Sequence, residues 1–220
     1  MGESARIEAL VKQRRGAGID IVVNDEVWMT VHRETVLEAG VRKGDPATED
    51  LRQRLTVADA ERQAYQAALS LLSYRARSEQ ELRQRLQRKG IAADAIQTAI
   101  DRLHRSGLID DAHFASAWVE SRGSGSSGHG SPLLAAELRS RGIDADSITA
   151  ALESTDDHAL ALAAARARLS RLRGLDYAGF RRRLGGFLQR RGFGYDVTNA
   201  TVRTLWQEAG GPSRSDDDAQ

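Results

Sequence analysis

The sequence contains no cysteine, only three prolines and few aromatic residues, 5% in all. The missing cysteine excludes disulfide scaffolds, catalysis by a thiol and metal sites with thiolate ligands. No apolar run reaches the roughly 18 residues that a membrane-spanning helix needs, and the N-terminus lacks the apolar core of a signal peptide. We therefore expect a soluble, cytoplasmic protein without a membrane segment.

Residues that could support catalysis or bind a metal are scattered. The five histidines show no metal-ligand spacing, and the sequence has neither G-x-S-x-G nor H-E-x-x-H. The pair Asp110-Asp111 is better explained by capping of a helix than by a metal site. The loop Gly123–Pro132 resembles a phosphate-binding loop only superficially, because His129 replaces the lysine. We expect no enzyme, no catalytic residue, no metal and no cofactor.

One segment of the sequence occurs three times. It reads ELRQRLQRKGIAADAI from Glu81, ELRSRGIDADSI from Glu137 and, in weaker form, FLQRRGFGYDVT from Phe187. In each copy a leucine lies four residues before the shared glycine, and a basic residue lies directly before it. The glycines, about fifty residues apart, are Gly90, Gly142 and Gly192. A repeat of this length is typical of helical arrays.

Each copy predicts a helix, a stop and a second helix. The glycine supplies the left-handed residue that ends the first helix. The aspartate four residues later, at Asp94, Asp146 and Asp196, is predicted to be the N-cap of the second helix. Ser78 with Glu81 forms a capping box before the first copy. In the first repeat we expect helices at residues 57–74, 79–89 and 94–105.

The first part of the sequence has a different pattern. Gly18–Val23 and Glu26–Val31 are rich in β-branched residues and are separated by Asn24-Asp25, which predicts a β-hairpin. We expect Trp28 and the strand valines to pack on a short helix, Glu34–Ala39, or on the helical array. Thr48 is the predicted N-cap of a helix through Leu55. Thr56 is the predicted N-cap of a separate, long helix.

The sequence therefore predicts a mainly α protein: a tandem array of three three-helix repeats with a small N-terminal extension that contains a β-hairpin. The third repeat is expected to contain helices His158–Leu172, Tyr177–Arg191 and Asp196–Glu208, with a kink or a close backbone approach at Gly185-Gly186. The predicted domains are the extension at 1–56, repeats at 57–106, 107–153 and 154–208, and a disordered tail at 209–220.

Charge is segregated along the chain although its net value is only +1. Nine arginines and one acid, Asp176, lie between Arg166 and Arg191, whereas Asp216, Asp217 and Asp218 lie in the tail. Such a cluster favours a basic surface with an anionic partner, since like charges repel. The arginines of the first helix in this stretch are Arg166, Arg168, Arg171 and Arg173. The predicted partner- or DNA-binding residues are Arg75, Arg77, Arg85, Arg88, Lys89, Arg139, Arg141, Arg181, Arg182, Arg183, Arg190 and Arg191.

Three motifs together resemble the RecX family, regulators of the RecA recombinase. They are ALSLLSYRARSEQELRQRLQRKGI, RLHRSGLIDDAHFASAWVESR and LLAAELRSRGI, in this order. The resemblance covers Ala64 to Glu208, and its third repeat is the most divergent. It implies a non-enzymatic modulator that binds the RecA–DNA filament and inhibits ATP hydrolysis, strand exchange and the SOS response.

Two other functions stay open at this point. Three-helix units also resemble helix-turn-helix modules, so the chain could be a stand-alone DNA-binding protein of single- or double-stranded DNA. Few aromatics lie among the basic residues, which argues against sequence-specific reading or a stacking platform. A structural adaptor would bind neither RecA nor DNA. We see no heptad pattern and expect a monomer.

Overall fold

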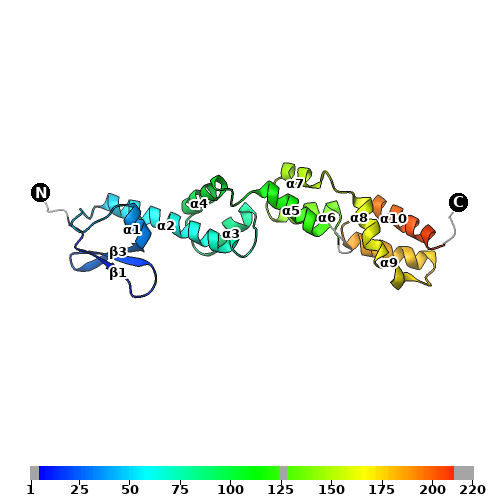
Figure 1. Cartoon of the computed structure of the whole chain (residues 1–220), viewed down its shortest axis with the longest axis horizontal. Coiled ribbons are helices and arrows are strands. Elements are labelled where there is room, and N and C mark those ends of the chain that lie inside the picture. The colour runs from blue at the N-terminus through cyan, green and yellow to red at the C-terminus, as the bar shows by residue number, and fades with distance from the viewer. Residues whose placement is uncertain (1–4, 124–127, 211–220) are drawn as a thin grey trace. The chain divides into compact units, whose positions relative to one another are not determined.

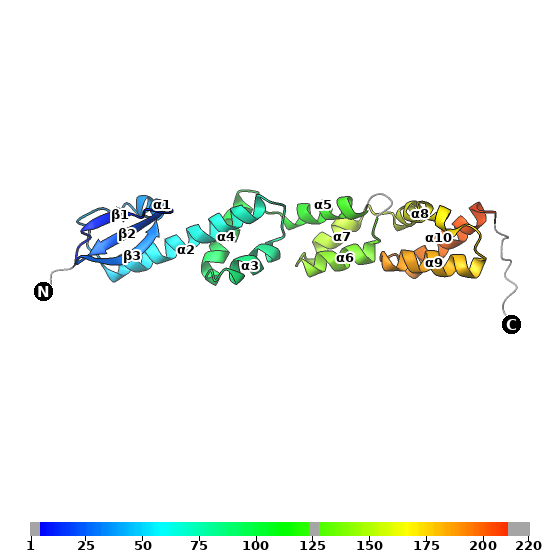
Figure 2. The ribbon, with the colours of Figure 1, turned by 90° about the horizontal axis from the view of Figure 1, so that it is seen from below.

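The computed structural model describes residues 5–123 and 128–210. The chain divides into two compact units, Met1–Ile109 and Asp110–Gln220. Helices dominate both units, and the strands lie at the N-terminal end of the first (Figures 1 and 2). The predicted fold class, mainly α with a small β-containing extension, is confirmed. Among the described residues, no helix combines the length and the apolar character needed to cross a membrane.

The extension contains a three-stranded antiparallel sheet in the order β1-β2-β3. Strands β2 (Gly18–Val23) and β3 (Glu26–His32) form the predicted hairpin, and Asn24 and Asp25 have the positive φ angles of its turn, 52° and 57°. Strand β1 (Ala9–Lys12) pairs with β2 and was not predicted. Its four residues are too few to produce a recognisable alternation of polar and apolar side chains.

The sheet packs on α1 (Arg33–Glu38) and on the first turns of α2. Its core is formed by strand residues such as Ile21 and Val31 together with Val36 and Leu55 from the helices. Trp28 is partly buried against this cluster. The expected packing of the hairpin on the short helix is therefore confirmed, and it gives the strands the apolar partner that an isolated hairpin lacks.

Helix α2 (Glu49–Leu72) is continuous, so the predicted break at Thr56 is wrong. Thr48 is the N-cap, and its hydroxyl accepts a hydrogen bond from the Leu51 amide at 3.1 Å. Thr56 instead donates its hydroxyl to the carbonyl of Arg52, one turn earlier, at 2.9 Å. A threonine can bond within a helix in this way, and sequence alone does not distinguish it from a cap. The proposed domain border between residues 56 and 57 lies inside α2.

The different roles of Thr48 and Thr56 can be tested by the effect of alanine substitutions on the free energy of unfolding. Thr48→Ala removes the cap and should lower the free energy of unfolding of the first unit by about 1 kcal/mol. Thr56→Ala removes only an internal hydroxyl and should change it by less than about 0.5 kcal/mol. Urea unfolding followed by circular dichroism measures both. A larger loss for Thr56→Ala than for Thr48→Ala would contradict the continuous helix.

The first repeat is completed by α3 (Glu79–Arg88) and α4 (Ala93–Arg105). Ser78 is fully buried and accepts a hydrogen bond from the Glu81 amide at 3.2 Å, as the capping box predicts. Gly90 follows the end of α3 and has the left-handed conformation, with φ 77°. Gly142 and Gly192 have the same conformation, each with φ 79°. The core of the repeat comprises Ala68, Leu82, Leu86, Ile96, Ile100, Leu103 and Ile109.

The three repeated aspartates are not the N-caps of the second helices. The N-cap lies two residues earlier, at Ala92, Asp144 and Gly194, and of these only Asp144 caps with its side chain, accepting from the Ser147 amide at 2.8 Å. Asp94, Asp146 and Asp196 lie in the first turn, where a carboxylate is favourable near the positive end of the helix dipole. Acidic residues are favoured both at the N-cap and in the first turn of a helix, so the sequence did not distinguish the two positions of the aspartates.

The second repeat consists of α5 (Asp111–Gly123), α6 (Ser131–Ser140) and α7 (Ala145–Leu152). Asp110 accepts a hydrogen bond from the His113 amide at 2.9 Å, which is the capping role expected for the acidic pair. Phe114, Leu138 and Ile148 belong to its core. Part of the predicted serine- and glycine-rich loop, residues 124–127, lies outside the described residues.

The third repeat contains α8 (Asp157–Arg166), the short 3₁₀ helix η2 (Leu169–Leu172), α9 (Tyr177–Arg190) and α10 (Tyr195–Glu208). The predicted single helix through Leu172 is wrong. Leu169 and Leu172 both pack on the repeat's core, and side chains three residues apart share an edge in 3₁₀ geometry. The predicted tail beyond Gly210 lies outside the described residues.

Helix α9 continues through Gly185 and Gly186 without interruption. Gly185 is buried, and a Cβ atom at this position would lie 3.7 Å from Thr198 Cγ2 of α10. This is an ordinary van der Waals distance, so the helices show neither the predicted kink nor a close approach that requires glycine at this position.

Within the second unit, repeats two and three are joined by direct bonds. The Gly130 amide donates to the Arg191 carbonyl at 2.9 Å. The amide and the hydroxyl of Ser131 both donate to Asp157 Oδ1, each at 2.9 Å. The start of α6 is thus held against the end of α9 and the start of α8.

Candidate anion-binding groove

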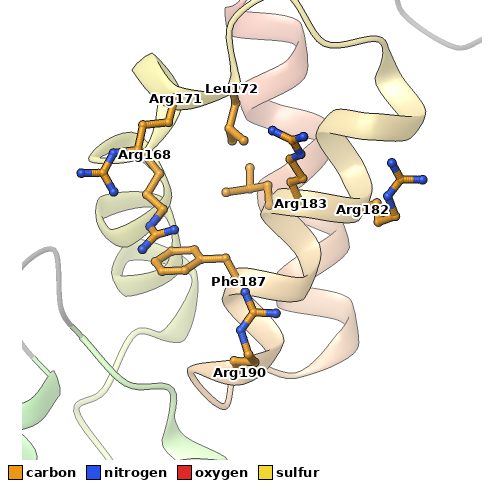
Figure 3. Close-up of a pocket in the computed structure, with 8 residues that line it drawn as sticks. Arg168, Arg171, Leu172, Arg182, Arg183, Phe187 and Arg190 are labelled. Atoms are coloured by element: carbon orange, nitrogen blue, oxygen red, sulfur yellow. The ribbon is translucent and has the colours of Figure 1, made fainter.

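A groove lies between the segment that follows α8 and the outer side of α9 (Figure 3). It encloses about 400 Å³. Most of its lining side chains are arginines, and the remainder are apolar. We call it the arginine groove; its lining residues are Arg168, Arg171, Leu172, Arg182, Arg183, Leu184, Phe187 and Arg190.

The floor of the groove is apolar and buried. Leu184 is fully buried and Phe187 is 6% exposed, so both belong to the core of the third repeat. The Arg168 guanidinium lies over the Phe187 ring, 4.2 Å from its centroid, and Arg191 lies 4.7 Å from the same ring. Contacts of this kind hold a guanidinium in place without neutralising it.

The arginines that line the groove come from two elements. Arg183, Phe187 and Arg190 recur at i, i+4 and i+7, so they lie on one side of α9. Arg168 is the N-cap of η2, and Arg171 lies inside η2 three residues later. In 3₁₀ geometry this spacing places both side chains on one edge of the helix. Figure 3 shows Arg168 and Arg190 beside Phe187, whereas Arg171 and Arg182 point away from the ring. The predicted binding set contained the α9 arginines but omitted Arg168 and Arg171, although both lie in the arginine-rich stretch.

The groove carries an uncompensated positive charge. Within residues 5–123 and 128–210, none of its five arginines forms an ion pair. The neighbouring Arg166 does form one, with Glu208 at 2.9 Å. Guanidinium groups bind phosphate or carboxylate oxygens through paired hydrogen bonds. Several of them around one concave surface, without a carboxylate of their own, are suited to an anionic ligand.

Two other predicted residues of the third repeat lie outside the groove. Arg181 is exposed on α9 but does not line it. Arg191 is partly buried and donates a hydrogen bond to the Gly128 carbonyl at 3.3 Å. Burial, together with the nearby charge of Arg168, lowers the pKa of Arg191, although an arginine stays protonated at neutral pH. The structure thus gives Arg191 a packing role at the junction of the two repeats.

The predicted basic residues of the first repeat differ in their exposure. Arg85, Arg88 and Lys89 are exposed on and just after α3, as the helical spacing predicts. Arg75 forms an ion pair with Glu81 at 2.9 Å.

Arg77, predicted to belong to the same basic surface, is buried. Its side chain donates to the Leu71 carbonyl at 3.0 Å, which joins α2 to the start of α3. Burial and the charges of Arg75 and Arg85 lower its pKa. Arg77 is therefore a structural residue, not a surface contact. A charged side chain just before a capping box gives no sign in the sequence that it is buried.

In the second repeat, Arg139 is exposed whereas Arg141 packs within its own repeat. The Arg141 guanidinium lies 3.8 Å from the centroid of Trp118 and donates to the Glu137 carbonyl at 2.8 Å. Arg122 lies over the same indole at 4.4 Å. Trp118 in turn donates its Nε1 proton to Glu137 at 2.8 Å. This arrangement accounts for Arg141 without an external partner.

Comparison with known proteins assigns all three repeats. Models of the first, second and third three-helix domains of RecX match residues 64–103, 110–152 and 155–202. The chain belongs to the RecX family. The RecX resemblance expected from the motifs is confirmed, and the arginine groove lies within the third RecX domain.

Relatives in the RecX family align over most of the chain. The regulatory protein RecX of Amycolatopsis mediterranei is 35% identical, over 72% of this chain and 91% of its own length. The RecX of Mycobacteroides abscessus is 40% identical, over 68% of this chain and 75% of its own length. The RecX of Thermobifida fusca is 37% identical, over 73% of this chain and 83% of its own length. These relatives are named as regulatory proteins, which supports a regulatory role in general.

Two solved RecX structures share the fold. A crystal structure of regulatory protein RecX superposes with a TM-score of 0.70 at 22% identity, covering 90% of this chain and 98% of its own. The RecX of Lactobacillus salivarius gives a TM-score of 0.61 at 26% identity, covering 67% of this chain and 97% of its own. They support the succession of three-helix domains.

Proposed function

We propose that this RecX-family protein is a non-enzymatic regulator that binds the RecA–DNA filament. Binding inhibits ATP hydrolysis and strand exchange by RecA, and so lowers recombination and the SOS response. Membership of a family of regulatory proteins supports the regulatory role. The observation that supports an anionic partner is the arginine groove, whose five arginines have no ion-pair partner among the described residues.

A RecA–DNA filament offers anionic groups of two kinds, the phosphates of the DNA and the carboxylates of the protein. Guanidinium groups bind either. The exposed Arg85, Arg88 and Lys89 of the first repeat are a second basic surface for the same partner. Each repeat is a small helical unit with its own core, so successive repeats can contact successive parts of a repetitive partner.

Direct binding tests this proposal. The anisotropy of a labelled single-stranded oligonucleotide would be measured during titration with the protein, once bare and once as a RecA filament held in its ATP-bound form. We expect binding to the filament to persist at a salt concentration that abolishes binding to the bare oligonucleotide. Equal salt dependence for both would contradict a specific interaction with the filament.

The arginine groove also fits the second candidate, a stand-alone DNA-binding protein without sequence preference. Five arginines that each neutralise a phosphate of a single strand would give log K against log salt a slope of about −3.5. A slope this steep for bare DNA, with no additional affinity for the filament, would favour this alternative. A structural adaptor would bind neither. The monomeric state and the cytoplasmic location stay predictions.

A further inference from the structure

Arg168 and Arg191 hold like charges against the same aromatic ring. Their guanidinium groups lie 4.2 and 4.7 Å from the centroid of Phe187. They are therefore at most about 9 Å apart, less than the Debye length of about 10 Å at 0.1 M salt. In the part of the chain that the structure describes, neither arginine forms an ion pair that would offset this repulsion. Burial and the charge of Arg168 both lower the pKa of Arg191.

Arg191 also belongs to the junction between repeats two and three. Its guanidinium donates to the Gly128 carbonyl at 3.3 Å, and its own carbonyl accepts a hydrogen bond from the Gly130 amide at 2.9 Å. Both glycines are buried and lie in the segment that leads into α6 of the second repeat. The repulsion from Arg168, a lining residue of the arginine groove, therefore acts on a side chain that holds the two repeats together.

The arginines that line the groove do not share one direction. Figure 3 shows Arg190 beside Phe187, whereas Arg171 and Arg182 point away from the ring. The free oxygens of a phosphate lie at corners of a tetrahedron, whereas the two oxygens of a carboxylate share a plane with its carbon. Guanidinium groups that come from different sides can therefore bind successive phosphates of one chain. A chain of phosphates also brings several negative charges into a groove of about 400 Å³.

We infer that a chain of phosphates binds in the arginine groove and, by neutralising Arg168, strengthens the bonds of Arg191 between repeats two and three. A phosphate beside Arg168 offsets the repulsion between the two cations, so the closed junction becomes more stable. The coupling is reciprocal, because the closed junction keeps the charge of Arg191 beside Phe187, where it attracts the phosphates. The inference rests on the anion-binding role proposed for the groove and needs no contact with RecA.

Hydrogen exchange of the Gly130 amide measures the junction directly, because this amide donates to the Arg191 carbonyl. The probe is tripolyphosphate, compared with sodium chloride at the same ionic strength. We expect saturating tripolyphosphate to slow exchange at Gly130 about fivefold. The Ile143 amide, which donates to the Leu138 carbonyl inside the second repeat at 3.2 Å, should slow by less than about twofold. Equal slowing of both amides, or unchanged exchange at Gly130, would overturn the coupling.

Two glutamine variants separate the coupling from the binding of the ligand. In Arg168→Gln the repulsion is already absent, so saturating tripolyphosphate should slow exchange at Gly130 by less than about twofold. Arg182→Gln is the matched control, since Arg182 lines the groove but points away from Phe187. It should weaken binding of tripolyphosphate and keep the full slowing of about fivefold at saturation. Calorimetric titration fixes the saturating concentration for each variant, and equal slowing in both would overturn the role of Arg168.

Three probes identify the class of the ligand. Tripolyphosphate and an oligothymidylate should both slow exchange at Gly130, whereas an oligoglutamate peptide of equal total charge should not. A lower half-saturating phosphate concentration for the oligothymidylate would identify a nucleic-acid strand as the source of the phosphates, and the reverse order a free oligophosphate. Equal slowing by the glutamate peptide would overturn the phosphate class. Because no probe involves RecA, failure of this inference and failure of filament inhibition are separate results.

Discussion

Replacement of Arg182 and Arg183 by glutamate, R182E/R183E, is expected to weaken binding to the RecA–DNA filament about 100-fold, equal to about 2.7 kcal/mol. The change removes two cations from the arginine groove and puts two anions in their place, so attraction becomes repulsion. Both side chains are exposed, and Asp176, which caps α9, is untouched. The fold should therefore stay intact, and circular dichroism should show unchanged helicity.

The matched control carries the same charge change on another surface. Arg14 and Arg15 are exposed in the loop between β1 and β2, and R14E/R15E should reduce filament affinity by less than about threefold through long-range charge alone. R85E/R88E tests the second predicted surface, on α3, and should also weaken binding. If R182E/R183E binds as well as R14E/R15E, the groove does not contact the filament.

Gly192→Ala should destabilise the second unit by about 3 kcal/mol, the largest stability effect that we expect from a single methyl group. Gly192 has φ 79°, which costs an alanine about 1 kcal/mol. Its Cβ would also lie 2.2 Å from Leu133 Cβ and 3.0 Å from the Leu133 amide nitrogen. Because backbone of α6 is involved, the clash cannot be relieved by rotation of a side chain, and overpacking of this kind adds about 2 kcal/mol.

Gly174 provides the control for this prediction. It lies in the same repeat with φ 77°, but a Cβ there would meet nothing within 4 Å. Gly174→Ala should therefore lower the free energy of unfolding only by the cost of the positive φ angle, about 1 kcal/mol. Urea unfolding can be followed by fluorescence in a Trp28→Phe background, in which the two remaining tryptophans, Trp118 and Trp206, both lie in the second unit. Equal losses for the two alanine variants would contradict the close contact between repeats two and three.

The helical array could be predicted because its signals are local. A glycine with positive φ ends one helix in each repeat, and leucine spacing identifies the buried face. Ser78 and Glu81 are three residues apart and bond across that distance. The hairpin is equally local, because Asn24 and Asp25 determine its turn. In each case the residues that decide the structure lie within a few positions of one another.

The errors occurred where distant contacts decide between local alternatives. Thr56 has the sequence context of a cap, yet the first turns of α2 are held by the sheet through Leu55, so the helix begins at Glu49. Leu169 and Leu172 could extend α8, but their packing on the core favours a 3₁₀ turn. Arg77 could have been exposed, and the Leu71 carbonyl holds it inside.

The candidate site was predictable only in part for the same reason. Helical periodicity places Arg183 and Arg190 on one side of α9. It cannot place Arg168 and Arg171 opposite them, because that requires α8 to end at Arg166 and the chain to turn. The apolar floor formed by Leu184 and Phe187 has the spacing of an ordinary core face, so nothing in the sequence marks it as part of a site.

The rate of single-strand-dependent ATP hydrolysis by RecA tests most directly whether this RecX-family protein regulates the RecA filament. The protein would be titrated into the reaction at two salt concentrations, the higher of which abolishes its binding to bare single-stranded DNA. We predict inhibition at the higher salt with the protein well below the concentration of RecA protomers. No inhibition, or inhibition only at amounts that coat the DNA, would contradict the account and leave a helical DNA-binding protein.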